Sequence, residues 1–280
     1  MPAEEIGQQL SAKGRGEDHV AGRNFASGRA SGCGIAVMAK ASTPGLTKTR
    51  LVPPLRFEEA AAFNTAFLQD VAANLMAAGR QAEITRYMAF GPPGSEGFFE
   101  GALGPDIGLI SAWQPNFGDC LLLAIEAMLA RGHGSAVVLN SDSPTLPTSL
   151  LIETAVVLAR PGDCAVLGPS TDGGYYLLGL KQAHRRMFED ITWSTEQVAE
   201  QTLERAREIG LDVHILPAWY DVDDLQSLRM LHEEIRGRRA IPSAHAPTLA
   251  LHTKALIDRL CRESDFAKRM GQGQLEAAPA

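Results

Sequence analysis

Short apolar runs alternate with amphipathic segments along most of the chain. The clearest run covers residues 135–139, and an uninterrupted apolar run of this length is typical of a central strand in a parallel sheet. The clearest amphipathic segment covers about 57–78, and its apolar residues recur every four positions: Phe63, Phe67, Val71 and Leu75. This spacing predicts a helix, and Gly79 stands where it should end.

The same patterns predict an ordered series of elements. Strands are expected over about 35–38, 83–90, 107–113, 135–139, 165–167, 176–180 and 212–216. Helices are expected over about 57–78, 119–131, 148–159, 195–209, 221–236 and 249–262, and a Gly/Pro-rich loop over 91–97. Because strands alternate with helices almost throughout, the expected fold class is α/β, with a mostly parallel central sheet covered by helices on both faces.

Composition divides the chain into three parts. Residues 1–31 are polar and rich in Gly, Ala and Ser, which predicts a flexible leader. Residues 32–236 contain all the alternating elements and are expected to form one domain. Residues 237–280 are predicted to form a Pro/Ala linker, a last amphipathic helix that folds back on the domain, and a frayed tail.

Charge and cysteine content narrow the functional classes. A net charge of -7 argues against binding to a nucleic-acid polymer, although one local basic loop would suffice for a nucleotide. The four cysteines form no C-x-x-C pair, which favours reduced thiols over a zinc site. No apolar run approaches the roughly 20 residues that span a bilayer, and the first residues lack an apolar signal core. A cytoplasmic protein is therefore expected, and its oligomeric state is left open.

A basic loop follows the first strand. It begins at Lys40, turns at Pro44-Gly45 and ends in Lys48-Thr49-Arg50. Backbone amides of such a loop can line an anion pocket, and Lys and Arg neutralise phosphate as a point charge and a planar fork. The pattern predicts a nucleotide phosphate site but is no Walker A loop, since the Gly-Lys-Ser/Thr ending is absent.

Asp142 follows the strand at 135–139 and is flanked by Ser141 and Ser143. Ligands of open α/β sheets bind beyond the carboxyl ends of the strands, and Mg²⁺ usually takes one or two carboxylates together with phosphate oxygens. Asp142 is therefore a candidate Mg²⁺ ligand. The alternative interpretation is a cap for the helix that begins near Pro147.

Two further acidic motifs have both a functional and a purely structural interpretation. Asp172-Gly173-Gly174-Tyr175-Tyr176 would let the backbone approach a ligand, with aromatic rings to cover it, or would simply form a hairpin turn. Asp221-x-Asp223-Asp224 would cap a helix, or one of Asp221 and Asp223 would complete a metal site with Asp142. Trp193, which precedes Ser194 as a possible helix cap, would pack beside the site or in the core.

In this order, these motifs resemble a bacterial family of GT-A-type proteins described as glycosyltransferases or as radical-SAM/selenodomain-associated transferases. The resemblance covers about residues 34–235. More distantly, the chain is similar to phospholactate guanylyltransferases and molybdenum-cofactor nucleotidyltransferases. The resemblance to the GT-A-type family implies the three-layer α/β/α fold of nucleotide-diphospho-sugar transferases. Two departures from the family pattern are Ser42, where proline is usual, and Cys120-Leu121-Leu122-Leu123, where Leu-Gly and an Arg are usual.

Carried over residue by residue, the resemblance assigns roles to the candidates. The phosphate site would consist of Lys40, Gly45, Lys48, Thr49 and Arg50. The acceptor site would consist of Asp172, Gly173, Gly174, Tyr175 and Trp193. Mg²⁺ or Mn²⁺ would be held by Asp142 and Asp223, and catalysis would rest on Lys48, Arg50 and Asp142.

The expected activity is transfer of a nucleoside monophosphate from an NTP to a small acceptor with a phosphate or hydroxyl group. The alternatives are glycosyl transfer from a nucleotide-diphospho-sugar and non-catalytic nucleotide binding. Against glycosyl transfer, the metal strand ends in Asn140-Ser141-Asp142 with a single acid, where Asp-x-Asp is common.

Overall fold

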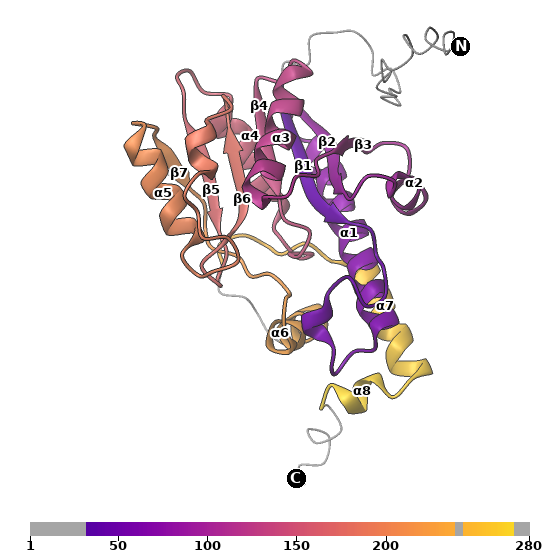
Figure 1. Cartoon of the computed structure of the whole chain (residues 1–280). Helices are drawn as coiled ribbons and strands as arrows, with labels where there is room; N and C mark the ends of the chain where they lie inside the picture. The colour runs from indigo at the N-terminus through magenta and orange to yellow at the C-terminus, as the bar shows by residue number, and fades with distance from the viewer. Residues whose placement is uncertain (1–31, 239–242, 272–280) are drawn as a thin grey trace, which may run out of the picture.

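The fold is built on one seven-stranded sheet. The computed structural model describes residues 32–238 and 243–271, and the strand order is β3-β2-β1-β4-β6-β5-β7 (Figure 1). The strands are β1 (Cys33–Lys40), β2 (Ile84–Gly91), β3 (Gly108–Ser111), β4 (Ser135–Leu139), β5 (Ala165–Pro169), β6 (Tyr175–Leu180) and β7 (Val213–Ile215). Only β6 runs antiparallel to its neighbours among these strands. The expected mostly parallel sheet is confirmed.

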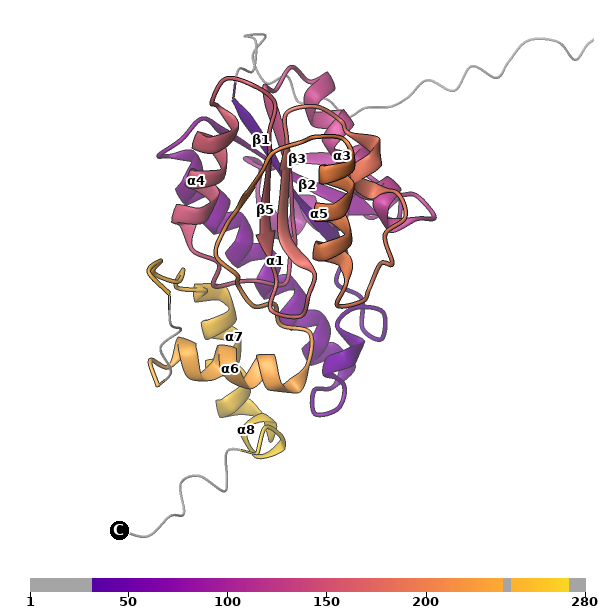
Figure 2. The ribbon, with the colours of Figure 1, turned by 90° about the vertical axis from the view of Figure 1, so that its left-hand side faces the viewer.

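Helices cover both faces of the sheet, as Figure 2 shows. They are α1 (Phe57–Gly79), α2 (Glu96–Leu103), α3 (Phe117–Ala130), α4 (Thr148–Leu158), α5 (Val198–Glu208), α6 (Leu225–Ile235), α7 (Leu251–Glu263) and α8 (Phe266–Arg269). Two short 3-10 turns, η1 (Thr49–Leu51) and η2 (Arg185–Phe188), lie in the loops. Helices α1 and α4 pack on one face of the sheet and α3 and α5 on the other.

The apolar run in β4 explains why it lies at the centre. All its residues are buried, and side chains alternate between the two faces of a strand. Val137 and Leu139 join the core beneath α1 and α4. Ala136 and Val138 join the core beneath α3 and α5. A strand with both faces covered needs apolar residues that face both sides, which is the pattern at positions 136–139.

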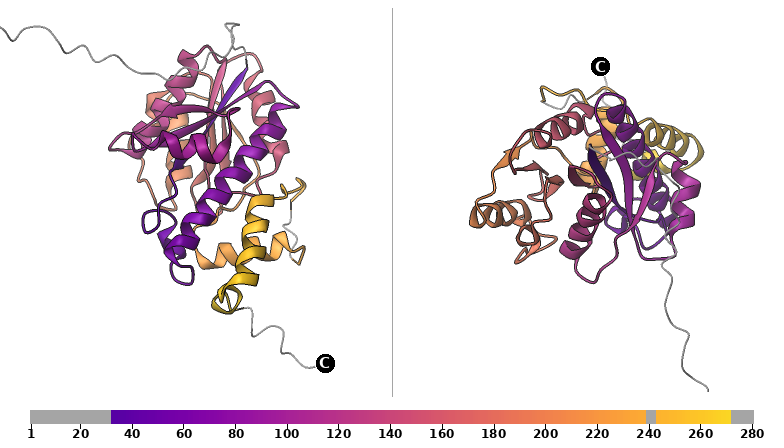
Figure 3. Two further views of the ribbon diagram at one scale, coloured as in Figure 1. Left: turned by 90° about the vertical axis from the view of Figure 1, so that its right-hand side faces the viewer. Right: turned by 90° about the horizontal axis from the view of Figure 1, so that it is seen from above.

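The last helices pack against α1 at one end of the domain (Figure 3). The carboxylate of Asp70, buried in α1, accepts hydrogen bonds at 2.8 Å from the backbone N–H groups of His252 and Thr253 and at 2.6 Å from the Thr253 hydroxyl. It thereby satisfies free N–H groups at the start of α7. The prediction that the last helix folds back on the domain is confirmed.

Several boundaries differ from the sequence expectations. The helix expected from 195 begins at Val198, and Gln197 rather than Ser194 takes the capping position. Helix α2 follows the Gly/Pro-rich loop and was not expected. The predicted leader at 1–31 and most of the predicted tail lie outside the described residues. Within the described ranges, no helix is both long and apolar enough to cross a membrane.

Candidate active site

A cavity of about 740 Å³ lies over the carboxyl edge of the sheet. Its walls come from the ends of β1, β2 and β4, from the loop after β3, and from the start of the antiparallel β6. The loop containing Lys48 and the segment before α6 complete it. This is where ligands bind in open α/β sheets, and the volume suits a nucleotide-sized molecule.

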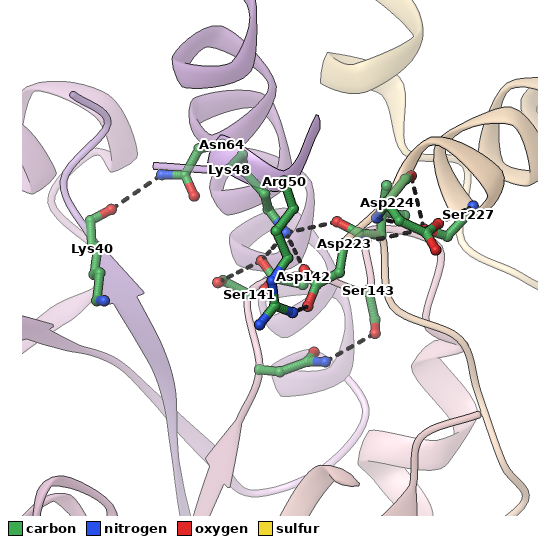
Figure 4. Close-up of polar contacts among 12 residues, drawn as sticks. Lys40, Lys48, Arg50, Asn64, Ser141, Asp142, Ser143, Asp223, Asp224 and Ser227 are labelled. Atoms are coloured by element: carbon green, nitrogen blue, oxygen red, sulfur yellow. Dashed lines mark hydrogen bonds and ion pairs between the residues drawn. The ribbon is translucent and has the colours of Figure 1, made fainter. Parts of the chain in front are cut away.

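Lys48 lies between the side chains of Asp142 and Asp223 (Figure 4). Its Nζ is 2.8 Å from Oδ1 of Asp142 and 3.0 Å from Oδ1 of Asp223. It also donates to the backbone oxygen of Val222 at 2.8 Å. An ammonium has three N–H donors, so these acceptors use all of them. The predicted convergence of the basic loop with distant aspartates is confirmed in the geometry.

The charge on Lys48 is strongly favoured in this place. Only 6% of its side chain is exposed, and burial by itself lowers the pKa of a lysine. Attraction to Asp142 and Asp223 outweighs burial, so the pKa of Lys48 is raised above its ordinary value. We refer to Lys48, Asp142 and Asp223 as the ionic cluster.

Backbone and serine contacts hold the acidic loops of the ionic cluster in place. The Val222 N–H donates to the backbone oxygen of Asp142 at 2.8 Å. The Ser141 hydroxyl donates to Oδ1 of Asp142 at 3.0 Å, and the Ser143 hydroxyl donates to the backbone oxygen of Tyr220 at 2.9 Å. The loop after β4 is therefore bound to the segment before α6.

Among the acids of these two motifs, Asp224 caps a helix and Asp142 does not. The capping position of α4 is Pro147, with no side-chain cap, so the interpretation of Asp142 as a cap is wrong. In the third motif the cap of α6 is Asp224, whose carboxylate accepts from the Ser227 N–H at 2.7 Å. Asp221 and Asp223 are therefore not needed for capping, and both line the cavity.

The other residues of the basic loop lie differently. Lys40, Thr49 and Arg50 line the cavity, whereas Gly45 is not among its lining residues. The Arg50 side chain is 72% exposed, and its Nη1 lies 3.7 Å from Oδ2 of Asp223. Because this pair is long and exposed, the guanidinium remains open to a ligand. The predicted phosphate contacts themselves stay predictions.

The Asp172 motif serves as both a turn and a part of the cavity wall. It joins the antiparallel strands β5 and β6, and Oδ1 of Asp172 accepts from the Gly174 N–H at 2.9 Å. Asp172 and Gly174 line the cavity, but Gly173 does not. Gly173 has φ of +90°, and a Cβ built there would lie 2.1 Å from the Glu196 backbone oxygen. Gly173 therefore allows a close approach to the backbone of Glu196, and not to a ligand in the cavity.

Asp221 has the most perturbed carboxyl group of the site. Burial raises its pKa to about 7, and repulsion from Asp172, Asp223 and Asp142 contributes in the same direction. From the motif alone Asp221 and Asp223 were both metal candidates, the resemblance favoured Asp223, and the structure shows how their surroundings differ. Asp223 contacts Lys48, whereas Asp221 lies close to three other carboxylates.

The carboxylates of Asp142 and Asp223 fit a hard divalent cation that also binds oxygens of a substrate. No three His, Cys, Asp or Glu side chains converge as a metal site within residues 32–238 and 243–271. Asp142 and Asp223 offer two carboxylates, and Mg²⁺ commonly takes one or two carboxylates plus substrate phosphates. Besides burial, repulsion from Asp172, Asp223 and Asp142 raises the pKa of Asp221, so negative charge is concentrated here. Both carboxylates already bind Lys48, so a metal would share them with the ammonium.

Sequence reasoning missed an aromatic part of the cavity wall. Trp113 and Phe117 line it and are about half exposed, at 48% and 51%. Phe117 contacts Trp193 edge-on, with ring centroids 5.3 Å apart, and Trp193 lies 6.5 Å from Tyr175. The available signal was the position of Trp113 at the end of a predicted strand, at the edge where ligands bind.

Comparisons with known proteins agree with this architecture. Residues 74–195 match a family model described as "uncharacterized protein conserved in bacteria (DUF2064)". A solved structure described as a "putative nucleotide-diphospho-sugar transferase" from Desulfovibrio desulfuricans G20 is 25% identical, with a TM-score of 0.72. That match covers 86% of this chain and 98% of that chain. The expected transferase-type GT-A fold is thereby confirmed.

Two further solved structures are less similar. One is a CMP:2-keto-3-deoxy-manno-octonic acid synthetase complexed with CTP, with 13% identity, a TM-score of 0.49, and coverage of 75% of this chain and 100% of that chain. The other is a cytidylyltransferase from Leptospira borgpetersenii serovar Hardjo-bovis (strain JB197), with 10% identity, a TM-score of 0.48, and coverage of 84% and 96%. No curated protein sequence matched the chain.

Proposed function

We propose that the protein is a nucleotidyltransferase that moves a nucleoside monophosphate from an NTP to a small acceptor, with Mg²⁺ or Mn²⁺ as cofactor. The observation that supports this most is the ionic cluster, in which Lys48 joins two aspartates beside the open guanidinium of Arg50. An anionic nucleotide and a divalent cation would both find partners there. A cytoplasmic location, where nucleotides are available, is part of the proposal.

The residues of the ionic cluster would position the reacting phosphates. Arg50 and Lys40 would meet phosphate oxygens, and Lys48 would hold Asp142 and Asp223 in place next to them. The bound cation would neutralise charge on the phosphate oxygens. The acceptor oxygen would form a bond to the α-phosphorus while the bond to the pyrophosphate leaving group breaks. Placement and charge neutralisation dominate such reactions.

Glycosyl transfer is the second candidate. It is favoured by the similarity to the Desulfovibrio structure, whose description names a nucleotide-diphospho-sugar transferase. Nucleotidyl transfer is favoured by the arrangement of the acids. Asp142 is the single acid at the end of β4, where glycosyltransferases of this type commonly carry Asp-x-Asp. The second acid of the ionic cluster, Asp223, comes from a distant loop.

Titration calorimetry with the four common NTPs and a set of nucleotide-diphospho-sugars, each with and without Mg²⁺, tests the proposal. We expect tighter, Mg²⁺-dependent binding of an NTP, and pyrophosphate release when the acceptor is present. Asp142→Asn should abolish the Mg²⁺ dependence, whereas Asp258→Asn, at an exposed acid on α7, should not. Sugar turnover without pyrophosphate would favour glycosyl transfer, and binding without either product would favour a non-catalytic binder.

A further inference from the structure

One part of the cavity is walled by aromatic side chains. We call Trp113, Phe117, Tyr175 and Trp193 the aromatic wall. Tyr175 and Trp193 pack against the core beneath α3 and α5, and Phe117 is the first residue of α3. The Nζ of Lys48, in contrast, lies 5.4 Å from the ring centre of Phe67 in α1. Figure 2 shows α1 and α3 on opposite faces of the sheet. The cavity therefore has an ionic side and an aromatic side.

Two buried polar atoms on this cavity wall lack a partner. Within the described part of the chain, neither the Tyr175 hydroxyl nor Oδ1 of Asn140 makes a hydrogen bond. Tyr175 begins β6 and Asn140 directly follows the neighbouring strand β4, and the Asn140 N–H donates to the backbone oxygen of Tyr176 at 2.8 Å. Buried polar groups are almost always paired, so unpaired ones in residues that line a cavity are candidates to pair with a ligand group. Both atoms are uncharged and suit a neutral hydrogen-bonding partner.

The distribution of charge excludes one class of partner from the aromatic side. Every cationic residue that lines the cavity in the described ranges lies between positions 40 and 50, namely Lys40, Lys48 and Arg50. The segments that hold Tyr175 and Trp193 contribute only acids, Asp172 and Glu196. A phosphate or carboxylate placed there would face like charges without a cation, which disfavours binding.

We propose that the aromatic wall binds the acceptor as an uncharged ring that bears several hydroxyl groups, as in a neutral sugar. The apolar face of such a ring packs on aromatic side chains, and its hydroxyls can pair with Tyr175, Asn140 and the carboxylate of Asp172. This inference rests on the proposed function for the role of acceptor. It excludes phosphorylated acceptors, which the sequence had left open.

Binding of matched sugars measures the preference directly. The probes are the methyl pyranosides of glucose, galactose, mannose and N-acetylglucosamine, each compared with its 6-phosphate and, where one exists, its uronate. Tryptophan fluorescence reports binding, because Trp113 and Trp193 line the cavity and Trp219, the only other tryptophan, is 2% exposed. We expect at least one neutral glycoside to bind about tenfold or more tightly than its charged counterparts.

Two neighbouring tyrosines provide a matched pair of variants. Tyr175→Phe removes a hydroxyl that has no partner, so the melting temperature should be unchanged or higher and sugar binding about three- to tenfold weaker. Tyr176→Phe removes a hydroxyl that donates to the Pro217 backbone oxygen at 3.0 Å, so the melting temperature should fall and sugar binding should persist.

Three results would overturn the proposal. These are failure of every neutral glycoside to bind, tighter binding of a phosphate or uronate, and equal sugar binding by wild type and Tyr175→Phe. If nucleosides displace the sugar and bind more weakly to Tyr175→Phe than to wild type, the nucleotide base occupies the aromatic wall. This result would also overturn the proposal. NTP binding with pyrophosphate release would leave the proposed function standing in each case. Sugar binding without any nucleotide binding would remove that function and retain the sugar site.

Discussion

At the scale of single residues, Lys48 both holds two loops together and lies in the proposed nucleotide site. Its ammonium bridges two loops that lie far apart in the sequence, and its three donors are occupied within the protein. The sequence predicted a phosphate contact for Lys48. The structure indicates that Lys48 also stabilises the fold, because its removal would leave two carboxylates without their shared cation.

Lys48→Ala should therefore reduce both stability and nucleotide binding. Loss of one partner of a buried pair costs about 3–5 kcal/mol, and because Asp142 and Asp223 are partly exposed we expect about 1–3 kcal/mol. Arg50→Ala is the matched control, since Arg50 also faces Asp223 but is 72% exposed. It should weaken nucleotide binding and change the free energy of unfolding in urea by about 0.5 kcal/mol or less. Equal stability of the two variants would contradict this account.

Asp221 should make stability depend on pH. It ionises near pH 4 in the unfolded chain, whereas its pKa in the folded protein is about 7. The folded state binds the proton more tightly, so this group's contribution to stability falls as pH rises through that window. Asp221→Asn should raise the melting temperature clearly more at pH 8 than at pH 5. Asp106→Asn, at an exposed acid between α2 and β3, should act equally at both pH values.

An Asp221→Asn effect of the same size at pH 5 and pH 8 would refute the assignment of the raised pKa. Mg²⁺ provides a second check. A divalent cation near Asp142 and Asp223 would lower the pKa of Asp221, so saturating Mg²⁺ should reduce the difference between the two pH values.

At the scale of elements, the turns and caps explain how the site is held. The Asp172 turn joins β5 to β6, and the Gly173 backbone oxygen accepts from the Ala199 N–H at 3.0 Å, which ties the turn to α5. The ionic cluster depends on the loops after β1 and β4 and before α6. Helix α7 supports α1 from outside and has no residue in the cavity wall.

Asp70→Ala should loosen α7 without altering the site. It removes the acceptor for two backbone N–H groups and a hydroxyl, and we expect a loss of about 2 kcal/mol. Amide hydrogen exchange at the start of α7 should accelerate. Asp258→Ala, which breaks partly exposed pairs with Lys254 on the same helix and with Arg236 after α6, should cost only about 0–1 kcal/mol. Unchanged exchange in Asp70→Ala would show that α7 is held by its apolar contacts alone.

At the scale of the whole molecule, the cavity joins segments that belong to both halves of the sheet. A ligand that spans the ionic and aromatic sides would therefore stabilise the domain as a unit. At a free concentration of about 100 times Kd, ligand adds about 2.7 kcal/mol. For a domain of this size that corresponds to a rise in melting temperature of about 5–10 °C.

An NTP with Mg²⁺ should produce such a rise, and the NTP with EDTA a much smaller one. Asp142→Asn should show the smaller rise under both conditions. A shift of equal size with Mg²⁺ and with EDTA would remove the cation from the proposed function, while leaving nucleotide binding intact.

The sequence by itself determined the elements, their order and the fold class. Burial of one stripe of a helix or both faces of a strand leaves a local periodic pattern, which is why α1 and β4 were predicted within a residue of their observed ends. It also indicated which charged residues lie at the ends of elements, because Lys48 and Asp142 follow predicted strands and Asp223 lies in the first turn of a predicted helix.

Only the tertiary structure decided which of these residues meet. Periodicity shows which face of an element is buried but does not identify its neighbours across the chain. The pairing of Lys48 with two acids, the different environments of Asp221 and Asp223, and the approach of Gly173 to Glu196 all depend on long-range packing. Tyr175 and Trp193 were predicted to line the site, but Trp113 and Phe117 of the aromatic wall were missed for the same reason, since they come from separate segments and share no local pattern with the other two.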